Sequence, residues 1–411
     1  MLERSKRMNV PEIRFKEFCD YYSDVLLEKC LSVSNKKNNK LEYKKEDALS
    51  VSDEFGVVNQ IEHLGRSYTG NNISTYKILN KGQIVYTKSP LKLKPFGIIK
   101  VNNNKPGIVS VLYAIYDVKE GFDPNYISVY FEPNFRLNRY LLPLINKGAK
   151  NTINISDETA LSGEVHIPLS YAEQQKIASY FQSLDSLIQT TSKELTSLKQ
   201  IKAASLQSMF PQEGETVPKV RFKGFEGEWE EKSFSALYKK SIIKNDLTFG
   251  ADKIISVANM YYLTNVNVSD LEYLKTYNIM KLGDIAFEGN KSKRFSHGRF
   301  VENTIGDGIV SHVFVVFHPI SAEHDINYWK YAINNENIMR NVLIRCTKSS
   351  TMMTDLVVDD FLKETILVPS YAEQQKIGAY FRNLDQQISL QTQRLEKLKQ
   401  IKAACLEKMF V

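Results

Sequence analysis

One long segment occurs twice in this chain of 411 residues, and the duplication limits the possible folds more than any other feature. Residues 170–210 align without gaps to residues 370–410, with 24 identities in 41 positions, and both copies begin with SYAEQQKI. A fainter match at nearly the same offset relates VPEIRFKEF (10–18) to VPKVRFKGF (217–225). The sequence therefore predicts two copies of one unit, each a globular part followed by a helix.

Each repeated segment has the pattern of a long amphipathic helix. Ser170 and Ser370 are followed three residues later by Glu173 and Glu373, which is the spacing of a capping box at a helix start. Apolar residues then recur at alternating spacings of four and three, a heptad seam that needs a partner helix. The seam positions are Ile177, Phe181, Leu184, Ile188, Leu195 and Leu198 in the first copy, and Ile377, Phe381, Leu384, Ile388, Leu395 and Leu398 in the second.

The two seams match position for position, which favours pairing of the helices with each other over separate packing of each helix on its own domain. Their interruption is also shared, because Thr191 and Gln391 occupy equivalent positions, and such a polar layer can fix helix register. A helix of this length spans about 60 Å, more than a domain of about 150 residues would cover. We expect an α+β (mixed α/β) fold in which an antiparallel coiled coil of two long helices separates two pseudo-symmetric globular domains.

The duplication also predicts the domain limits. Strand patterns such as GIVSHVFVVF alternate in the globular parts with a helical pattern at INYWKYAINNENIMRNVL. The polar segment PQEGETVPK is typical of a linker. We predict a first domain over 9–169, a first long helix over 170–210, a linker over 211–219, a second domain over 220–369 and a second long helix over 370–411.

The composition favours a nucleic-acid partner over a membrane or a metal. The net charge is +7 and the pI is about 8.9, and nucleic acid is the commonest acidic partner of basic proteins. The N-terminal segment has no apolar signal core and no apolar run approaches about 20 residues, so we expect a cytoplasmic protein. The four cysteines are scattered and include no C-x-x-C pair, so the sequence indicates no disulfide framework or zinc site, and we expect no metal.

Basic residues gather at equivalent places in the two copies, chiefly after the strand pattern that ends GQIVY in the first copy and GDIAF in the second. Lysine and arginine neutralise phosphates, and arginine and lysine can also donate to base edges in the major groove. These residues are therefore candidates for DNA contact. They are Lys88, Lys92, Lys94, Lys100, Lys147 and Lys150 in the first copy, and Lys291, Lys293, Arg294, Arg299, Arg345 and Lys348 in the second.

The basic segments differ between the copies far more than the helices do. Residues 86–106 and 287–307 share three identities in 21 positions, whereas the helices share 24 in 41. A constant frame that carries two different basic surfaces is what a protein needs to recognise two different half-sites.

This layout resembles the specificity subunit of Type I restriction-modification enzymes over essentially the whole chain. The resemblance lies in the A-E-Q-Q-K-I entry to each helix, the F-x-x-L-D motif that follows it (181–185 and 381–385), and the V-P-x-x-R-F-K opening of each half. It implies that each globular part is a target recognition domain for one half of a split, asymmetric DNA sequence. It also implies two modification subunits that methylate adenine with S-adenosylmethionine, and two restriction subunits that use ATP and Mg²⁺.

Two other classes of function compete with this interpretation. A DNA adenine methyltransferase needs an N-P-P-Y tetrad, which the sequence lacks, and there is no phosphate-binding P-loop. We therefore expect no catalytic residue and no cofactor in this chain. The alternative that remains open is a coiled-coil adaptor that joins two protein-binding modules, and it predicts no salt-dependent binding to duplex DNA.

Overall fold

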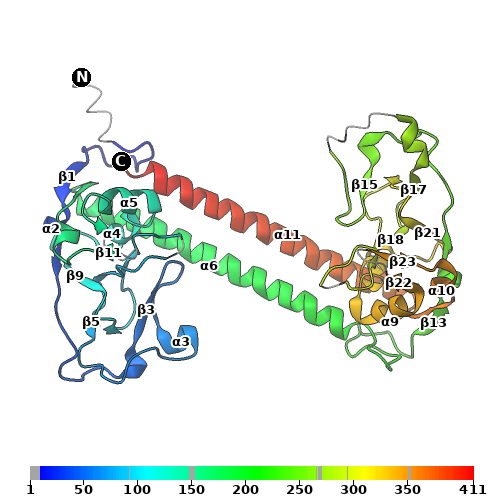
Figure 1. Cartoon of the computed structure of the whole chain (residues 1–411), viewed down its shortest axis with the longest axis horizontal. Helices are drawn as coiled ribbons and strands as arrows, with labels where there is room; N and C mark the ends of the chain where they lie inside the picture. The colour runs from blue at the N-terminus through cyan, green and yellow to red at the C-terminus, as the bar shows by residue number, and fades with distance from the viewer. Residues whose placement is uncertain are drawn as a thin grey trace. The chain divides into compact units, whose positions relative to one another are not determined.

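The computed structural model describes residues 10–91, 93–147, 153–264, 266, 271–293, 295–349 and 353–411. The chain divides into two compact units. Unit 1 consists of Met1–Thr191 and Arg394–Val411, and unit 2 of Ser192–Gln393. Each unit contains one globular domain together with part of both long helices (Figure 1).

The two long helices are α6 (Tyr171–Ser208) and α11 (Tyr371–Lys408). In unit 1 the start of α6 lies beside the end of α11, since Lys402 Nζ is 2.5 Å from Asp185 Oδ1. In unit 2 the end of α6 lies beside the start of α11, where Lys202 contacts Asp385. The predicted antiparallel pairing and the mixed α+β fold are thus confirmed. The aspartates come from the repeated F-x-x-L-D motif and the lysines from the repeated LKQIKAA.

The residues of the predicted seam are all buried or half-buried. The shared interruption is polar in different ways in the two helices. Thr191 is buried, whereas Gln391 is half-buried and its side-chain amide donates to Glu194 Oε2 at 3.1 Å.

The domain of unit 1 is built on a four-stranded antiparallel sheet in the order β2-β9-β6-β7. Its members are β2 (Leu31–Val33), β9 (Ala114–Val118), β6 (Ile84–Tyr86) and β7 (Ile99–Val101). The paired strands are β1 (Ser23–Leu26) with β12 (Glu164–Ile167), β3 (Leu49–Ser52) with β4 (Gly56–Asn59), β5 (Lys77–Leu79) with β8 (Gly107–Val109), and β10 (Asn146–Lys147) with β11 (Ile153–Asn154). The helices are α2 (Leu27–Cys30), α3 (Gln60–Leu64), α4 (Pro124–Tyr130) and α5 (Asn134–Leu141), with 3₁₀ turns at Lys45–Asp47 and Thr159–Leu161.

The domain of unit 2 repeats this topology, with the sheet order β14-β21-β18-β19. Its members are β14 (Tyr238–Lys240), β21 (Val315–Pro319), β18 (Ile285–Glu288) and β19 (Arg299–Glu302). The paired strands are β13 (Glu230–Ser233) with β24 (Thr365–Val368), β15 (Ile255–Ser256) with β16 (Tyr261–Tyr262), β17 (Asn278–Met280) with β20 (Gly308–Val310), and β22 (Thr347–Ser349) with β23 (Thr354–Leu356). The helices are α7 (Phe234–Leu237), α8 (Ile326–Ala332), α9 (Glu336–Cys346) and α10 (Val358–Lys363), with 3₁₀ turns at Ala251–Lys253 and Leu271–Thr276.

The glutamate of the repeated octapeptide fastens each helix to the opening motif of its own domain. Glu173 is 1% exposed, and its two carboxylate oxygens accept hydrogen bonds of 2.7 Å from the Arg14 guanidinium. Glu373 is fully buried and binds Arg221 in the same bidentate way at 2.7 Å. The predicted capping box is therefore only half formed. The Ser170 hydroxyl accepts from the Glu173 backbone, but a buried carboxylate is best satisfied by a guanidinium that matches it at both oxygens.

The first glutamine of the octapeptide makes another fixed connection. Gln174 Oε1 accepts from the Asp123 backbone N–H at 2.9 Å, and Gln174 Nε2 donates to the Pro168 carbonyl at 2.9 Å. Asp123 in turn caps α4 by accepting from the Tyr126 backbone N–H. Gln374 makes the equivalent contacts in unit 2. The octapeptide is repeated because its serine, glutamate and glutamine hold the domain and the helix together.

The end of each long helix completes the core of the domain in its own unit. Phe410, at the end of α11, packs in unit 1 with ring centroids 5.6 Å from Tyr126 and 6.0 Å from Phe181. Arg136 lies over the Phe410 ring at 4.5 Å and donates to the Leu406 carbonyl at 2.6 Å. Each domain core thus depends on a helix that follows the other domain in the sequence.

The core of unit 2 is completed in the same way by the end of α6. Phe210 stacks on Tyr328 at 5.8 Å and on Phe381 at 6.1 Å, and it meets Trp229 edge-on. The M-F pair that ends both repeats therefore has one structural role in both units.

Candidate nucleic-acid interface

The candidate lysines of unit 1 are partly engaged in ion pairs within the domain. Lys88 Nζ lies 2.5 Å from Asp157, which also binds Lys77 at 2.8 Å. Although burial acts to raise the pKa of Asp157, these two lysines hold it below its usual value. The contact between Lys88 and Asp157 joins the loop after β6 to the segment after β11.

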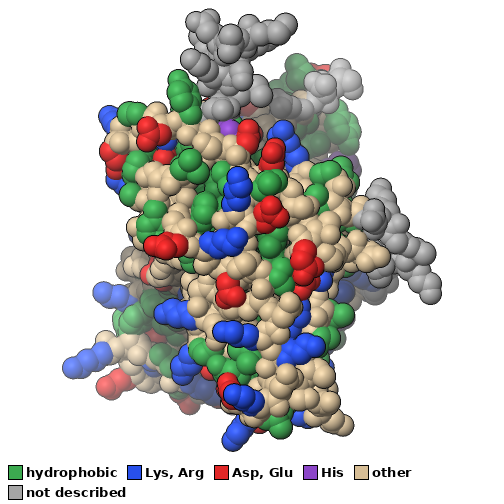
Figure 2. Space-filling model, turned by 90° about the vertical axis from the view of Figure 1, so that its left-hand side faces the viewer, with side chains coloured by type: hydrophobic (Ala, Val, Ile, Leu, Met, Phe, Trp, Pro, Cys, Tyr) green, Lys and Arg blue, Asp and Glu red, His purple; other side chains and the backbone are tan. Residues whose placement is uncertain are grey.

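Two further lysines of unit 1 lie around one aspartate. Lys94 Nζ is 3.3 Å from Asp53 and donates to the Glu132 carbonyl at 2.6 Å. Lys100 Nζ is 3.9 Å from the same aspartate, and burial lowers the pKa of this lysine. Lys147 lies in β10, and Lys92 and Lys150 lie outside the described residues. Figure 2 shows lysine and arginine side chains interspersed with acidic ones on the face of unit 1 that it views.

Two candidate arginines of unit 2 are also held by acids. Arg299 donates to Glu288 Oε2 at 2.6 Å and to the Ala258 carbonyl at 2.7 Å. Arg345 binds Glu364, but its side chain remains 57% exposed. Arg294 lies outside the described residues. Lys291, Lys293 and Lys348 are exposed.

The two basic segments of unit 2, which the sequence predicts separately, meet in the fold. The backbone N–H of Thr354 donates to the Gly289 carbonyl at 2.9 Å, and Asn290 pairs with Met353 as an isolated bridge. The loop after β18 with Lys293 therefore lies beside the β22–β23 hairpin with Lys348. A Cβ on Gly289 would lie 2.2 Å from the Thr354 carbonyl oxygen, so this close approach requires glycine.

A cleft of about 640 Å³ in unit 2 contains functional candidates that the sequence analysis missed. Cations line it from three elements, Lys202 from α6, Lys330 from α8 and Arg299 from β19. Amide side chains, among them Gln207 and Asn334, line it as well. The repeated LKQIKAA motif contains Lys202 and was a signal for it. Helical periodicity alone does not indicate that this residue lies beside the globular domain.

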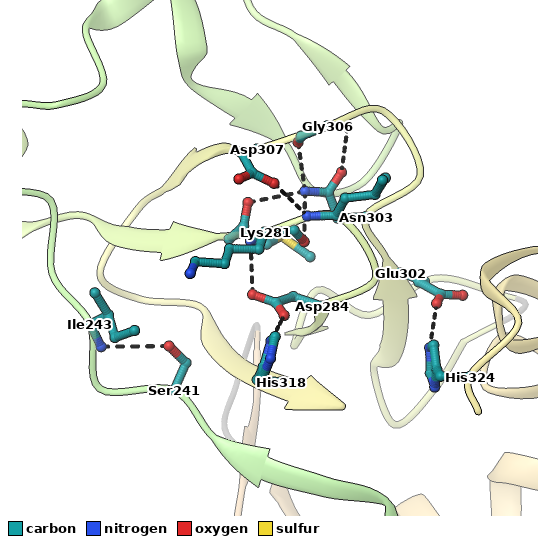
Figure 3. A network of polar contacts seen from close by, with 12 residues as sticks. Ser241, Ile243, Lys281, Asp284, Glu302, Asn303, Gly306, Asp307, His318 and His324 are labelled. Carbon is teal, nitrogen blue, oxygen red and sulfur yellow. Dashed lines mark hydrogen bonds and ion pairs between the residues drawn. The ribbon is translucent and has the colours of Figure 1, made fainter. Parts of the chain in front are cut away.

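Two acid–histidine pairs, each with a buried acid, lie near the sheet of unit 2 (Figure 3). Asp284 Oδ1 lies 2.6 Å from His318 Nδ1, and Glu302 Oε1 lies 2.9 Å from His324 Nε2. Burial raises the pKa of Asp284, raises that of Glu302 well above its usual range, and lowers that of His324 to about 4. Burial thus favours the neutral form of both members of the hydrogen-bonded Glu302–His324 pair. The Glu302–His324 pair is buried in the domain, whereas the His318 side chain is 41% exposed.

The lowered pKa of His324 predicts that the stability of unit 2 depends on pH. This pKa is about 4 in the folded state and about 6.5 when unfolded, so the unfolded state binds more protons between these values. The contribution of neutral His324 to the free energy of unfolding is complete above about pH 6.5 and is lost as the pH falls toward 4. The raised pKa of Glu302 has the opposite effect, because it makes the folded state more stable as the pH falls. The substitution Glu302→Gln removes this effect.

In Glu302→Gln protein we expect the free energy of unfolding to fall by about 2–3 kcal/mol between pH 7 and pH 4.5 because of His324. Phe122 precedes Asp123 in unit 1 as His324 precedes Asp325 in unit 2, so Phe is the natural replacement. Urea denaturation at several pH values should show this loss much reduced in Glu302→Gln/His324→Phe. An equal pH dependence in both variants would show that His324 is not the group responsible.

Comparisons with known proteins agree with the duplicated architecture. Residues 227–400 match the profile of the family described as "Type I restriction modification DNA specificity domain". The fold is similar to that of the Type I restriction-modification S subunit from M. genitalium, with a TM-score of 0.59 and 10% identity over 98% of this chain and 99% of that one. The HsdS subunit from Thermoanaerobacter tengcongensis gives a TM-score of 0.44 and 13% identity over 95% and 96% of the two chains. No protein of curated function matches the chain.

Among the described residues, no helix has the length and apolar character that a membrane span requires.

Proposed function

We propose that this chain is a specificity (S) subunit of a Type I restriction-modification system, and that it recognises a bipartite, asymmetric DNA site and directs the modification and restriction subunits to it. The match of residues 227–400 to the DNA specificity domain supports DNA sequence recognition within a restriction-modification complex, by a subunit that is not itself catalytic. The bipartite site is our inference from the duplication. Two units share one topology and one set of helix anchors, yet they present different basic loops.

The loops support two separate contacts with DNA. In unit 2 the exposed Lys293 and Lys348 come from segments that lie side by side, and exposed cations of this kind contact phosphates and base edges. In unit 1 the loop after β6 and the segment after β11 are joined in the equivalent place by Lys88 and Asp157. Two half-sites about one helical turn apart, roughly 34 Å, present the same groove face to both units.

The repeated helices support a symmetric set of partners. Because the octapeptide and its anchors occur in both units, we propose that two modification subunits bind equivalent surfaces and methylate adenine with S-adenosylmethionine. Two restriction subunits would use ATP and Mg²⁺, and the complex would act in the cytoplasm, where the chromosomal DNA lies. The cofactors would all bind to the partner subunits.

Selection from a random duplex library tests this proposal. The chain, assembled with its modification subunits, should enrich sequences with two short defined blocks separated by a gap of fixed length. Binding should weaken steeply with added salt, because phosphate contacts release counterions. Enrichment of a single block, or binding to a protein but not to duplex DNA, would favour the coiled-coil adaptor instead.

Lys293→Ala should weaken binding to the selected duplex about tenfold, and any loss of base preference should be confined to one block, because Lys293 is exposed on the basic loop of unit 2. Lys232→Ala is the matched control, since this partly exposed lysine of β13 pairs with Glu230 and lies outside the basic loops. Competition binding with single-base variants of each block measures the effect. Unchanged affinity and selectivity in Lys293→Ala would remove this loop from the interface.

A further inference from the structure

The cleft of unit 2 between α6, α8 and the start of α9 has a composition suited to an anionic ligand. We propose that it binds the sugar–phosphate backbone of DNA next to the half-site of unit 2, and that unit 1 has no equivalent backbone site. This inference rests on the proposed function, because the ligand is the same duplex. It adds the long helix α6 to the DNA-binding surface of one unit.

Arg299 has its own acidic partner in Glu288, whereas the two lysines of the cleft share one carboxylate. Asp385 of α11 forms ion pairs with both lysines. Lys202 contacts Oδ1, and Lys330 Nζ lies 3.1 Å from Oδ2. One carboxylate therefore serves two lysines. The Lys330 side chain is 44% exposed and the Lys202 side chain 26% exposed, so both ammonium groups retain N–H donors that solvent or a phosphate can reach.

The rest of the cleft provides neutral donors and space. Gln207 and Asn337 are exposed and Asn334 is half-buried, and amide N–H groups commonly donate to phosphate and sugar oxygens. Glu336 is the one acidic residue among the lining residues, which also include Lys202, Lys330 and Arg299. A volume of about 640 Å³ is enough for a phosphate together with its sugar.

The corresponding positions of unit 1 carry the opposite chemistry. Helices α4 and α8 can be superposed by their capping residues Asp123 and Asp325, which places Ser128 at the position of Lys330 and Glu132 at that of Asn334. The lysine of α11 that corresponds to Lys202 is then held by two acids. Lys402 Nζ lies 2.5 Å from Glu132 and 2.5 Å from Asp185. Because both acids bind Lys402, this lysine is less available to a phosphate than Lys202 and Lys330, and we therefore place the backbone contact in unit 2 alone.

Exchanging the chemistry of unit 2 for that of unit 1 tests the inference. The variant Lys330→Ser/Asn334→Glu, in the full chain assembled with its modification subunits, is measured against the duplex obtained by library selection. We expect binding about tenfold weaker near 0.15 M salt, and a salt dependence reduced by about one to two phosphate contacts. Base preference in both blocks should be unchanged. Ethylation of phosphates should interfere with the wild-type protein at one more place than with the variant.

The controls separate the possible causes of a result. Lys363→Ser removes an exposed lysine of α10 outside the cleft and should leave affinity and salt dependence unchanged. Asn334→Glu alone, which keeps Lys330, provides a second variant should the double variant fold poorly, and it should show part of the same loss. Equal affinity, salt dependence and ethylation pattern in wild type and in these variants would overturn the backbone site. If wild-type protein itself selects no sequence, the proposed function fails and the cleft inference fails with it.

Discussion

Arg221→Ala should destabilise unit 2 by about 3–5 kcal/mol, because it leaves the buried carboxylate of Glu373 without its bidentate partner. Removing one member of a buried ion pair costs more than the pair contributes, since the remaining charge has lost its solvation and gained nothing in exchange. Urea denaturation gives the free energy of unfolding. Hydrogen exchange should show the loss of protection at the start of α11 and in the opening segment of the second domain.

Arg345→Ala is the matched control for this prediction. It removes the same side chain from an ion pair with Glu364 in the same unit, but this arginine is 57% exposed, so the cost should be about 0–1 kcal/mol. The double variant Arg221→Ala/Glu373→Ala should recover part of the lost stability, because it also removes the unpaired carboxylate. A cost for Arg221→Ala no greater than that for Arg345→Ala would mean that the ion pair is not what holds α11 to its domain.

Phe410→Ala should destabilise unit 1 by about 3–5 kcal/mol, although the residue is the last but one of the chain. Its ring is 4% exposed and packs on Tyr126, Tyr130 and Phe181 in the core of the first domain. Removing the ring leaves a cavity and also takes away the surface over which Arg136 lies. Hydrogen exchange should therefore show faster exchange in α4 and α5, and not only at the end of α11.

Leu390→Ala, also on α11, is the control, since this side chain is 65% exposed and its loss should cost little. Phe210→Ala should have the same effect in unit 2 that Phe410→Ala has in unit 1. If Phe410→Ala affects only the last turns of α11, the helix end is an appendage and not part of the first domain's core.

The sequence predicts the long helices and their antiparallel pairing well, because a heptad seam repeated in two copies leaves few other arrangements. It does not predict what the repeated polar residues contact. The S-x-x-E spacing indicates a local capping box, whereas the glutamates bind arginines 159 and 152 residues away in the sequence. Such partners are chosen by the tertiary fold, and spacing along one helix carries no information about them.

The basic loops show the same limit. The segment after β6 contains no acid, which suggests unpaired lysines, but Lys88 meets Asp157, which is 69 residues further on. Arg299 is held by Glu288 on the neighbouring strand β18, and Lys94 by Asp53. Charge counting therefore identifies candidate segments, but it overstates how many of their cations lack an acidic partner within the domain. Among the described candidates, the exposed Lys293 and Lys348 of unit 2 are the best candidates for DNA contact.

The central claim is that two look-alike units in one chain each recognise their own part of one DNA site. Single-molecule mapping of methylated adenine in the host genome, with the chain present and with it deleted, tests this claim most directly. The account predicts a motif of two different short blocks with a gap of constant length, methylated only when the chain is present, and Lys293→Ala should alter one block alone. A continuous motif, two identical blocks, or methylation that persists without the chain would contradict it.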